Sequence, residues 1–152
     1  MNINPAPARS AGPAFDTAKL DRLMDEAGID VLLATSKHNT QYLLGGYKFI
    51  FFAAMDAIGH SRYLPVVIYE KGATDHSAYI GNKMEGGEHA NKPFWMPTVH
   101  TATWGTLDAA RLAVEHLKKI GKSGARIGIE PAFLPSDARD LLAAELGGAR
   151  FV

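Results

Sequence analysis

Histidine is the residue type in this sequence that most readily suggests chemistry, because imidazole binds metal ions and transfers protons near neutral pH. The chain contains six: His38, His60, His76, His89, His100 and His116. No two of them are spaced i,i+4, and none lies in an HxH or HExxH pattern. In the adjacent pairs Asp75-His76 and Glu88-His89, the two side chains diverge on any regular element. We therefore predict that no site in this chain holds a metal ion unaided.

Two short patterns imitate catalytic motifs, and each lacks a required residue. Gly121-Lys122-Ser123 matches the end of a phosphate-binding P-loop, but His116 stands where that motif needs a glycine. Gly59-His60-Ser61-Arg62 is similar to a nucleophile elbow, but Tyr63 replaces the closing glycine and a strand follows instead of preceding it. A stand-alone α/β serine hydrolase with Ser61 as nucleophile stays as an alternative function, and a solvated loop serine is the simpler interpretation.

Arg62 lies between an aromatic segment and a predicted strand. A guanidinium group at such a place can bind a carboxylate through two parallel hydrogen bonds. The alternative is a solvated surface arginine. Four aromatic residues in six positions precede it: Tyr47, Phe49, Phe51 and Phe52. They cannot all face one core from a single regular element, so we expect some to pack inside and others to cover a partner surface.

Composition limits the classes of function. The chain has 152 residues, which favours one domain, and its 16 Lys and Arg balance its 16 Asp and Glu. A nucleic-acid partner is disfavoured, because binding one needs an excess of positive charge. The absence of cysteine excludes disulfides and thiolate chemistry. The longest apolar run, Phe49 to Met55, is far shorter than the roughly 20 residues of a membrane span.

The first 14 residues form a tail that precedes the folded domain. They contain three prolines and one arginine, without the apolar or amphipathic pattern of a targeting signal. We therefore expect a cytoplasmic protein with an N-terminal tail at residues 1–14 and one folded domain at residues 15–152. The last predicted strand begins at Arg150 and the chain stops at Val152. We expect from this that the sequence is a fragment trimmed at a domain boundary.

Helices and short apolar strands alternate along the folded region, which predicts an α/β fold. Residues 17–27 have helical spacing between an Asp16 N-cap and Gly28. An apolar strand follows at 30–35, a short helical turn at 37–44, a strand at 63–69 and its return strand at 77–80. Residues 82–97 form a long polar connection, which is often functional or partly helical.

The second half repeats the alternation. A brief strand at 98–101 precedes a helix at 106–120, which Thr106 caps and in which His116 lies on the exposed side. A buried strand follows at 125–129, and Ser136 caps a last helix that stops at Gly147-Gly148. With the final strand, this predicts a mostly buried sheet of about five or six strands flanked by helices.

Two stretches at the two ends of the domain resemble one known family. Residues 22–46, RLMDEAGIDVLLATSKHNTQYLLGG, are similar to the opening helix, strand and N-x-x-Y-L-x-G turn of the creatinase/prolidase N-terminal domain. Residues 126–152, RIGIEPAFLPSDARDLLAAELGGARFV, are similar to the same domain's closing I-G-x-E strand, helix and F-V strand. The turn motif departs at Leu44, where the family usually has threonine.

The resemblance implies a three-layer fold with a mixed sheet, ribonuclease H-like, preceding a catalytic domain that is absent from this chain. That domain would hold two divalent metal ions (Mn, Co or Zn) and hydrolyse Xaa-Pro peptides or related C–N bonds. This chain would hold no cofactor itself. The resemblance further implies a homodimer and a peptide or small amidic substrate. It places Arg62, His60, Tyr42 and Asn39 at the rim of the substrate pocket.

We therefore interpret the chain as the non-catalytic N-terminal domain of a metal-dependent Xaa-Pro peptidase-like hydrolase, such as a prolidase or Xaa-Pro aminopeptidase. It would provide dimer contacts and part of the substrate-pocket wall. Two alternatives remain at this point: the small serine hydrolase, and a small-ligand or protein-binding module without an attached enzyme.

Overall fold

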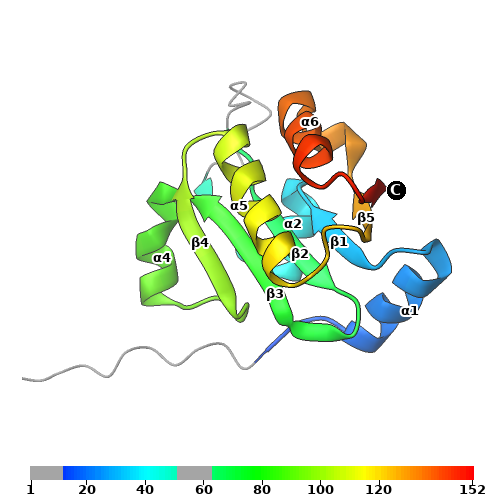
Figure 1. The fold of residues 1–152 in the computed structure, drawn as a ribbon. Helices are drawn as coiled ribbons and strands as arrows, with labels where there is room; N and C mark the ends of the chain where they lie inside the picture. Colours follow the sequence, from blue (N-terminus) through cyan, green and yellow to red (C-terminus); the bar gives the residue numbers. More distant parts are fainter. Residues whose placement is uncertain (1–11, 51–62) are drawn as a thin grey trace, which may run out of the picture.

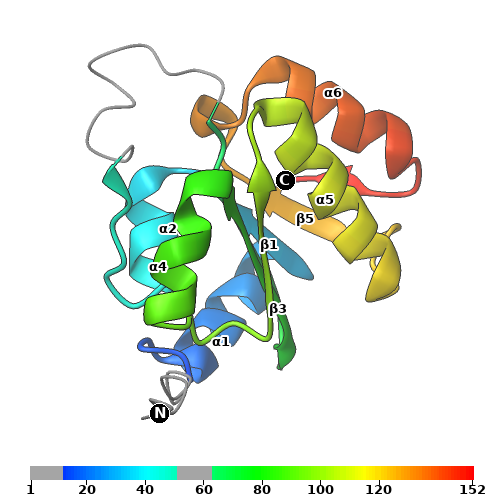
Figure 2. The same cartoon turned by 90° about the vertical axis from the view of Figure 1, so that its left-hand side faces the viewer.

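A computed structural model describes residues 12–50 and 63–152 as a six-stranded sheet between two layers of helices (Figures 1 and 2). The strands are β1 (Val31–Ala34), β2 (Val66–Glu70), β3 (Ala73–Asn82), β4 (Thr98–Thr103), β5 (Arg126–Ile129) and β6 (Arg150–Phe151). The α-helices are α1 (Thr17–Ala27), α2 (Lys37–Leu43), α4 (Gly86–Asn91), α5 (Thr106–Lys119) and α6 (Ser136–Glu145), joined by the short 3-10 helices η1 (Lys83–Glu85) and η2 (Pro131–Phe133). The expected three-layer α/β architecture is confirmed. None of these helices combines the length and the apolar character that crossing a bilayer requires.

The sheet is mixed, with strand order β4-β3-β2-β1-β5-β6. Strand β2 runs antiparallel to both its neighbours, whereas β3 and β4, β1 and β5, and β5 and β6 pair in parallel. The other five strands therefore point the same way and their carboxyl ends meet at one edge of the sheet. We call it the carboxyl edge. Ligands of α/β sheets commonly bind at such an edge.

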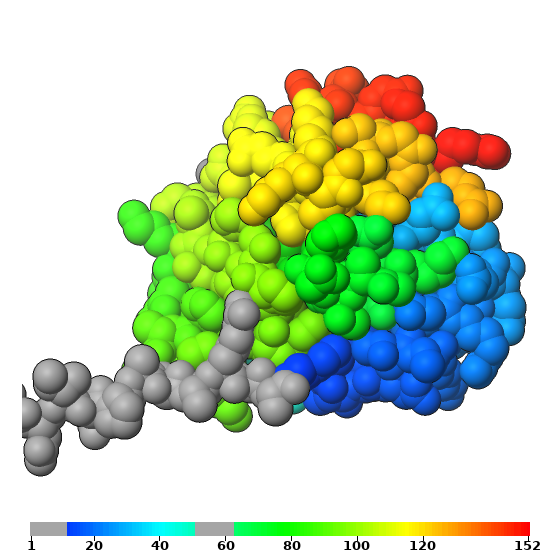
Figure 3. Space-filling view, turned by 60° about the horizontal axis from the view of Figure 1, so that its bottom comes forward, coloured from blue at the N-terminus to red at the C-terminus, as the bar shows by residue number. Residues whose placement is uncertain are grey.

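Helix α1 forms as its sequence predicts. The Asp16 carboxylate accepts from the Lys19 N–H at 2.9 Å, and Gly28 ends the helix with φ of 67°, a left-handed conformation that glycine adopts without strain. The helix lies against the turn between β2 and β3, seen as blue beside green in Figure 3. The Asp21 carboxylate accepts from the Tyr69 hydroxyl at 2.8 Å and from the Gly72 N–H at 3.1 Å. These bonds fix the end of the molecule opposite the carboxyl edge.

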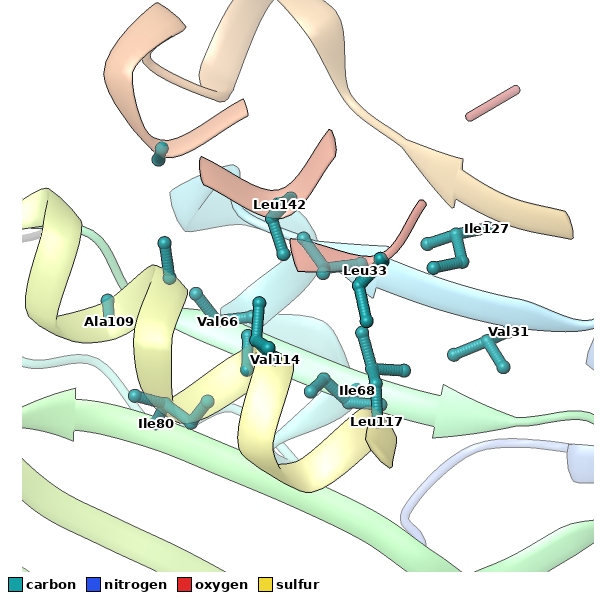
Figure 4. Packing of buried hydrophobic residues seen from close by; sticks show 14 of the residues in the cluster. Val31, Leu33, Val66, Ile68, Ile80, Ala109, Val114, Leu117, Ile127 and Leu142 are labelled. Carbon is teal, nitrogen blue, oxygen red and sulfur yellow. The ribbon is translucent and has the colours of Figure 1, made fainter. Parts of the chain in front are cut away.

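Strand β2 lies at the centre of two apolar cores, and all five of its residues are buried. Val66 and Ile68 face α5 and α6, where they pack with Leu117 and Leu142 (Figure 4). Val67 faces the other layer, whose core contains residues of α2 and the Phe94–Met96 segment. Burial on both faces explains why the β-branched run shows no alternation of polar and apolar residues.

The N-cap residues expected for α5 and α6 were wrong. The N-cap of α5 is Gly105, so Thr106 is the first helical residue, and Pro135 occupies the same position before α6. The Thr106 hydroxyl instead donates to the Asp137 carboxylate at 2.6 Å and ties the starts of the two helices together. The connection at 82–97 is partly helical, as expected, because it contains η1 and α4.

Candidate functional site

Two carboxylate networks lie at the carboxyl edge, one after β5 and one after β3. Glu130 follows β5 directly, and Glu85 ends the short helix η1 after β3. Each carboxylate accepts four hydrogen bonds from segments far away in the sequence or from its own turn. The two networks set the shape of this edge.

Glu130 fixes the start of α2. Its Oε2 accepts from the backbone N–H groups of Thr35 and Ser36 at 2.7 and 2.8 Å, and its Oε1 accepts from the Ser36 hydroxyl at 2.7 Å. The Asn39 amide donates to the same Oε1 at 2.6 Å. Burial alone would raise the pKa of Glu130, but the donors from Ser36, Thr35 and Asn39 outweigh it and lower that pKa. The ionised Glu130 carboxylate thus binds the hydrogen-bond donors at the N-terminal end of α2.

Asn39 and Tyr42, both expected at a pocket rim, lie one turn apart on α2. Asn39 is committed to Glu130 and also lines a groove of about 390 Å³ between α1 and α2. Tyr42 is 62% exposed and lies between this groove and a hollow of about 400 Å³ beside Gly45 and Gly46. The structure therefore brings these two residues together and gives Asn39 a structural partner.

Glu85 is fully buried at 0% exposure and is surrounded by tyrosines. Its Oε1 accepts from the hydroxyls of Tyr79 at 2.6 Å and Tyr47 at 3.0 Å. Its Oε2 accepts from the Tyr63 hydroxyl at 2.8 Å and from the Asn82 N–H at 2.5 Å. Burial raises the pKa of Glu85 above its ordinary value, although the four donors act in the opposite direction. Burial also raises the pKa values of the three tyrosines, so they remain hydroxyl donors.

This network joins two segments that flank residues 51–62. Tyr47 precedes that stretch and Tyr63 follows it, and both donate to the one carboxylate. Gly81 is required nearby, because a Cβ there would lie 2.5 Å from the Glu85 Oε2. Sequence analysis missed Glu85, although Asn82-Lys83-Met84-Glu85 has the spacing of a capping box, and the structure forms one.

The two carboxylates have a structural role. With four donors each, neither Glu130 nor Glu85 keeps a free lone pair for a substrate proton, and water does not reach Glu85. Beside the Glu85 network, where Tyr47 reaches the surface, a cleft of about 450 Å³ is lined by residues 44–47, residues 91–95, Glu88, Gly12 and Ala14. Within residues 12–50 and 63–152, no three His, Asp or Glu side chains are grouped closely enough to hold a metal ion.

His60 and Arg62, the other two residues expected at a pocket rim, lie outside the described residues. Ser61, the alternative nucleophile, lies outside them too. Of the aromatic segment, Tyr47 and Phe49 are described, and Phe49 is buried with its ring 5.8 Å from that of Tyr63. The roles of His60, Ser61 and Arg62 stay predictions.

The prediction that His116 faces solvent was wrong, because it is only 4% exposed. The His116 imidazole is 2.7 Å from the His76 carbonyl oxygen, and a carbonyl only accepts, so Nε2 carries the proton. Nδ1 is buried and has no hydrogen-bond partner. The Nδ1 atom of the neighbouring His76 lies 2.6 Å from one carboxylate oxygen of Glu70, and the Lys122 ammonium lies 2.9 Å from the other. Helix α5 thus carries a polar residue on its buried face.

We expect His116 to make the domain less stable in acid. Burial lowers its pKa below the ordinary value of 6.5, and the nearby His100, Lys119 and His76 add to this. Below about pH 6.5 the unfolded chain therefore takes up the proton before the folded chain does, so the free energy of unfolding falls as pH falls. His116→Gln keeps a donor for the His76 carbonyl and does not titrate.

Urea unfolding of both proteins between pH 8 and pH 5 checks this expectation. The variant should match wild type near pH 8 within about 1 kcal/mol, the net value of a hydrogen bond, and should lose less stability toward pH 5. Parallel pH curves for the two proteins would contradict the assignment.

Comparisons with known proteins agree with the α/β fold described above. The family model described as Creatinase/Prolidase N-terminal domain matches residues 17–152. No protein in a curated collection matches the sequence significantly. Among solved structures, a Xaa-Pro dipeptidase from Bacillus anthracis is 18% identical with a TM-score of 0.61, over 90% of this chain and 32% of its own.

Two solved single domains are similar over nearly their whole length. A domain of a dipeptidase from Streptococcus thermophilus is 12% identical with a TM-score of 0.63, and the match covers 90% of this chain and 89% of that one. The N-terminal domain of the cytoplasmic peptidase PepQ from Mycobacterium tuberculosis is 17% identical with a TM-score of 0.58, at the same coverage. At these identities the likeness shows the fold. This chain spans about a third of the Bacillus anthracis protein.

Proposed function

Because the chain belongs to the creatinase/prolidase N-terminal domain family, we propose that it is the non-catalytic N-terminal domain of a metal-dependent Xaa-Pro peptidase-like hydrolase. The observation that carries the proposal is the family match over residues 17–152. The names of the similar proteins, which include Xaa-Pro dipeptidases and a cytoplasmic peptidase, support an Xaa-Pro peptide substrate and a cytoplasmic location.

In this proposal the chemistry belongs to a catalytic domain outside this chain. There, two divalent ions (Mn, Co or Zn) would lower the pKa of a bound water so that it can attack the amide. The present chain would contribute part of the substrate-pocket wall and contacts in a homodimer. Its two carboxylate networks support that role, because they hold α2 and the segments before and after residues 51–62 at the carboxyl edge.

Within the pocket wall we propose that Arg62 binds the substrate carboxylate, with His60, Tyr42 and Asn39 nearby. A charge-assisted bond of this kind contributes about 1.5–3 kcal/mol. Arg62→Ala in the parent protein should therefore lower kcat/KM for Ala-Pro by roughly 10- to 200-fold, while the melting temperature stays near wild type. Arg62→Lys should recover little, because lysine lacks the planar fork of arginine.

The test uses the parent protein that contains this chain. Steady-state hydrolysis of Ala-Pro and Gly-Pro is measured with added Mn²⁺ and again after a chelator, alongside residues 1–152 alone. Chelator-sensitive turnover by the parent, absent from residues 1–152, supports the proposal. Ester turnover by residues 1–152 that Ser61→Ala abolishes would replace it with the serine hydrolase. Wild-type kcat/KM in Arg62→Ala would remove Arg62 from the site.

A further inference from the structure

Exposed apolar side chains gather at the carboxyl edge. Among the described residues, Met84 is 55% exposed, Trp104 59%, Leu107 37% and Phe133 50%. Each lies in a connection that leaves this edge or in the first turn of the helix that follows it. We call these four residues the edge patch. Trp95, the other tryptophan, is by contrast buried and donates to the Leu43 carbonyl at 2.7 Å.

The connections that carry the edge patch are joined to one another. Strands β3 and β4 pair Asn82 with Thr103, which brings η1 next to Trp104, and the Lys83 ammonium lies 5.9 Å from the centre of the Trp104 ring. The Thr106–Asp137 hydrogen bond joins the starts of α5 and α6, just after Trp104 and Phe133. Figures 1 and 2 both place these two helix starts at the same end of the molecule.

The composition of the edge patch is that of an interface centre. Tryptophan, phenylalanine and methionine are enriched in the cores of protein interfaces, and charged side chains surround them at the rim. Lys83, Asp108 and Arg111 supply such charges here, and the latter two form an exposed ion pair of 3.7 Å. Domains that act alone rarely leave several large apolar side chains exposed together.

The chain's direction identifies the occupant. Strand β6 runs parallel to β5, so Val152, the residue after it, lies at the carboxyl edge. Any polypeptide that continues from Val152 therefore starts at the same edge of the sheet as the edge patch, next to β5, whose following connection carries Phe133. The similar Bacillus anthracis dipeptidase is about three times as long as the part of it that this chain matches.

We propose that the edge patch is the docking surface for the domain that follows Val152 in the parent protein. This inference rests on the proposed function, which places a catalytic domain there. Trp104 and Phe133 would be the anchors, and Met84 and Leu107 would fill the space between them and the partner. The sheet end that carries the two carboxylate networks would then face the catalytic domain directly.

A second exposed apolar region serves as the internal control. Leu23 on α1 is 47% exposed and lines the groove between α1 and α2. It lies away from the connections that carry the edge patch. The proposal gives it no role in docking.

Hydroxyl-radical footprinting with mass spectrometry compares residues 1–152 with the parent protein. Trp104 and Met84 should react strongly in residues 1–152 and several-fold less in the parent. Leu23 should react equally in both, and buried Trp95 should react weakly in both. Equal reactivity of Trp104 and Met84 in the two proteins would overturn the proposal. So would protection of Leu23 in their place, or protection of Trp104 in residues 1–152 through a dimer seen by sedimentation.

Variants separate docking from folding and from activity. The double variant Trp104→Ser, Phe133→Ser should unfold in urea like wild type as residues 1–152, and in the parent it should restore the reactivity of Met84. The matched variant Leu23→Ser should leave Met84 protected. If Met84 stays protected in the double variant, the edge patch is not the docking surface. A parent that protects Trp104 but cleaves no Xaa-Pro peptide would refute the proposed activity and leave the docking surface standing.

Discussion

Glu85→Leu should be among the most destabilising substitutions in the domain. It removes the acceptor of the Tyr63 and Tyr79 hydroxyls and of the Asn82 N–H, which are all deeply buried. The two hydroxyls lie 3.3 Å apart, so one can still donate to the other, and one hydroxyl and the Asn82 N–H lose their partner. A buried donor without a partner costs about 1–3 kcal/mol, so two of them should lower the free energy of unfolding by roughly 2–6 kcal/mol. Urea unfolding followed by circular dichroism measures the loss. Glu115→Ala, which truncates an exposed glutamate, should cost well under about 1 kcal/mol.

A second substitution shows whether the lost hydrogen bonds are the cause. Tyr79→Phe should destabilise the wild-type domain, because Glu85 then loses a donor. In the Glu85→Leu background the same change should cost clearly less, because the acceptor of the Tyr79 hydroxyl is already absent. A smaller effect of Tyr79→Phe in the Glu85→Leu background is the expected result. If the two costs simply add, the hydroxyl of Tyr79 does not depend on Glu85 and the network does not act as a unit.

Leu117→Ala is expected to destabilise the domain by a comparable amount, because it removes apolar packing. Leu117 is 0% exposed, and it points from α5 to the face of the sheet that carries Ile68 and Ile80 (Figure 4). Cutting it back to alanine leaves a cavity and should cost about 2–5 kcal/mol in urea unfolding. Leu117→Met, which nearly conserves volume, should cost under about 1.5 kcal/mol.

The control for this helix lies two residues earlier. Glu115 is exposed on the opposite face of α5, and Glu115→Ala should change the unfolding free energy by well under about 1 kcal/mol. Equal costs for Glu115→Ala and Leu117→Ala would mean that the buried face of α5 is assigned wrongly.

The sequence predicted best those elements whose stabilising contacts lie close together in the chain. Helix α1 shows this best, since the Asp16 cap, the apolar spacing and the Gly28 terminus all lie within a few residues of one another. The buried strands were recognised from short apolar runs. Strand β3 extends to residues 73–82, beyond the predicted 77–80, because its pairing with β2 resumes at Ala73, opposite Glu70, and the hydrogen bonds of a ladder do not depend on side-chain polarity.

Long-range contacts account for what the sequence analysis missed. His116 was placed on the exposed side of its helix, but the His76 carbonyl of β3, 40 residues earlier, accepts a hydrogen bond from its Nε2–H and makes its burial possible. Thr106 was expected to cap α5, but the Asp137 carboxylate on α6 takes its hydroxyl. Glu85 could have been found from its capping-box spacing, whereas nothing near it in the sequence indicates that three tyrosines converge on it.

The Glu130 network also constrains the order in which the chain can fold. Helix α2 has seven residues, too few to persist on its own in water, and the donors at its start find their acceptor 91 to 95 positions later in the chain. Closing so long a loop is slow compared with forming a local turn. We therefore infer that α1 and the β2–β3 hairpin form first, and that α2 becomes stable only when β5 pairs with β1. During synthesis, α2 would stay incomplete until Glu130 has left the ribosome.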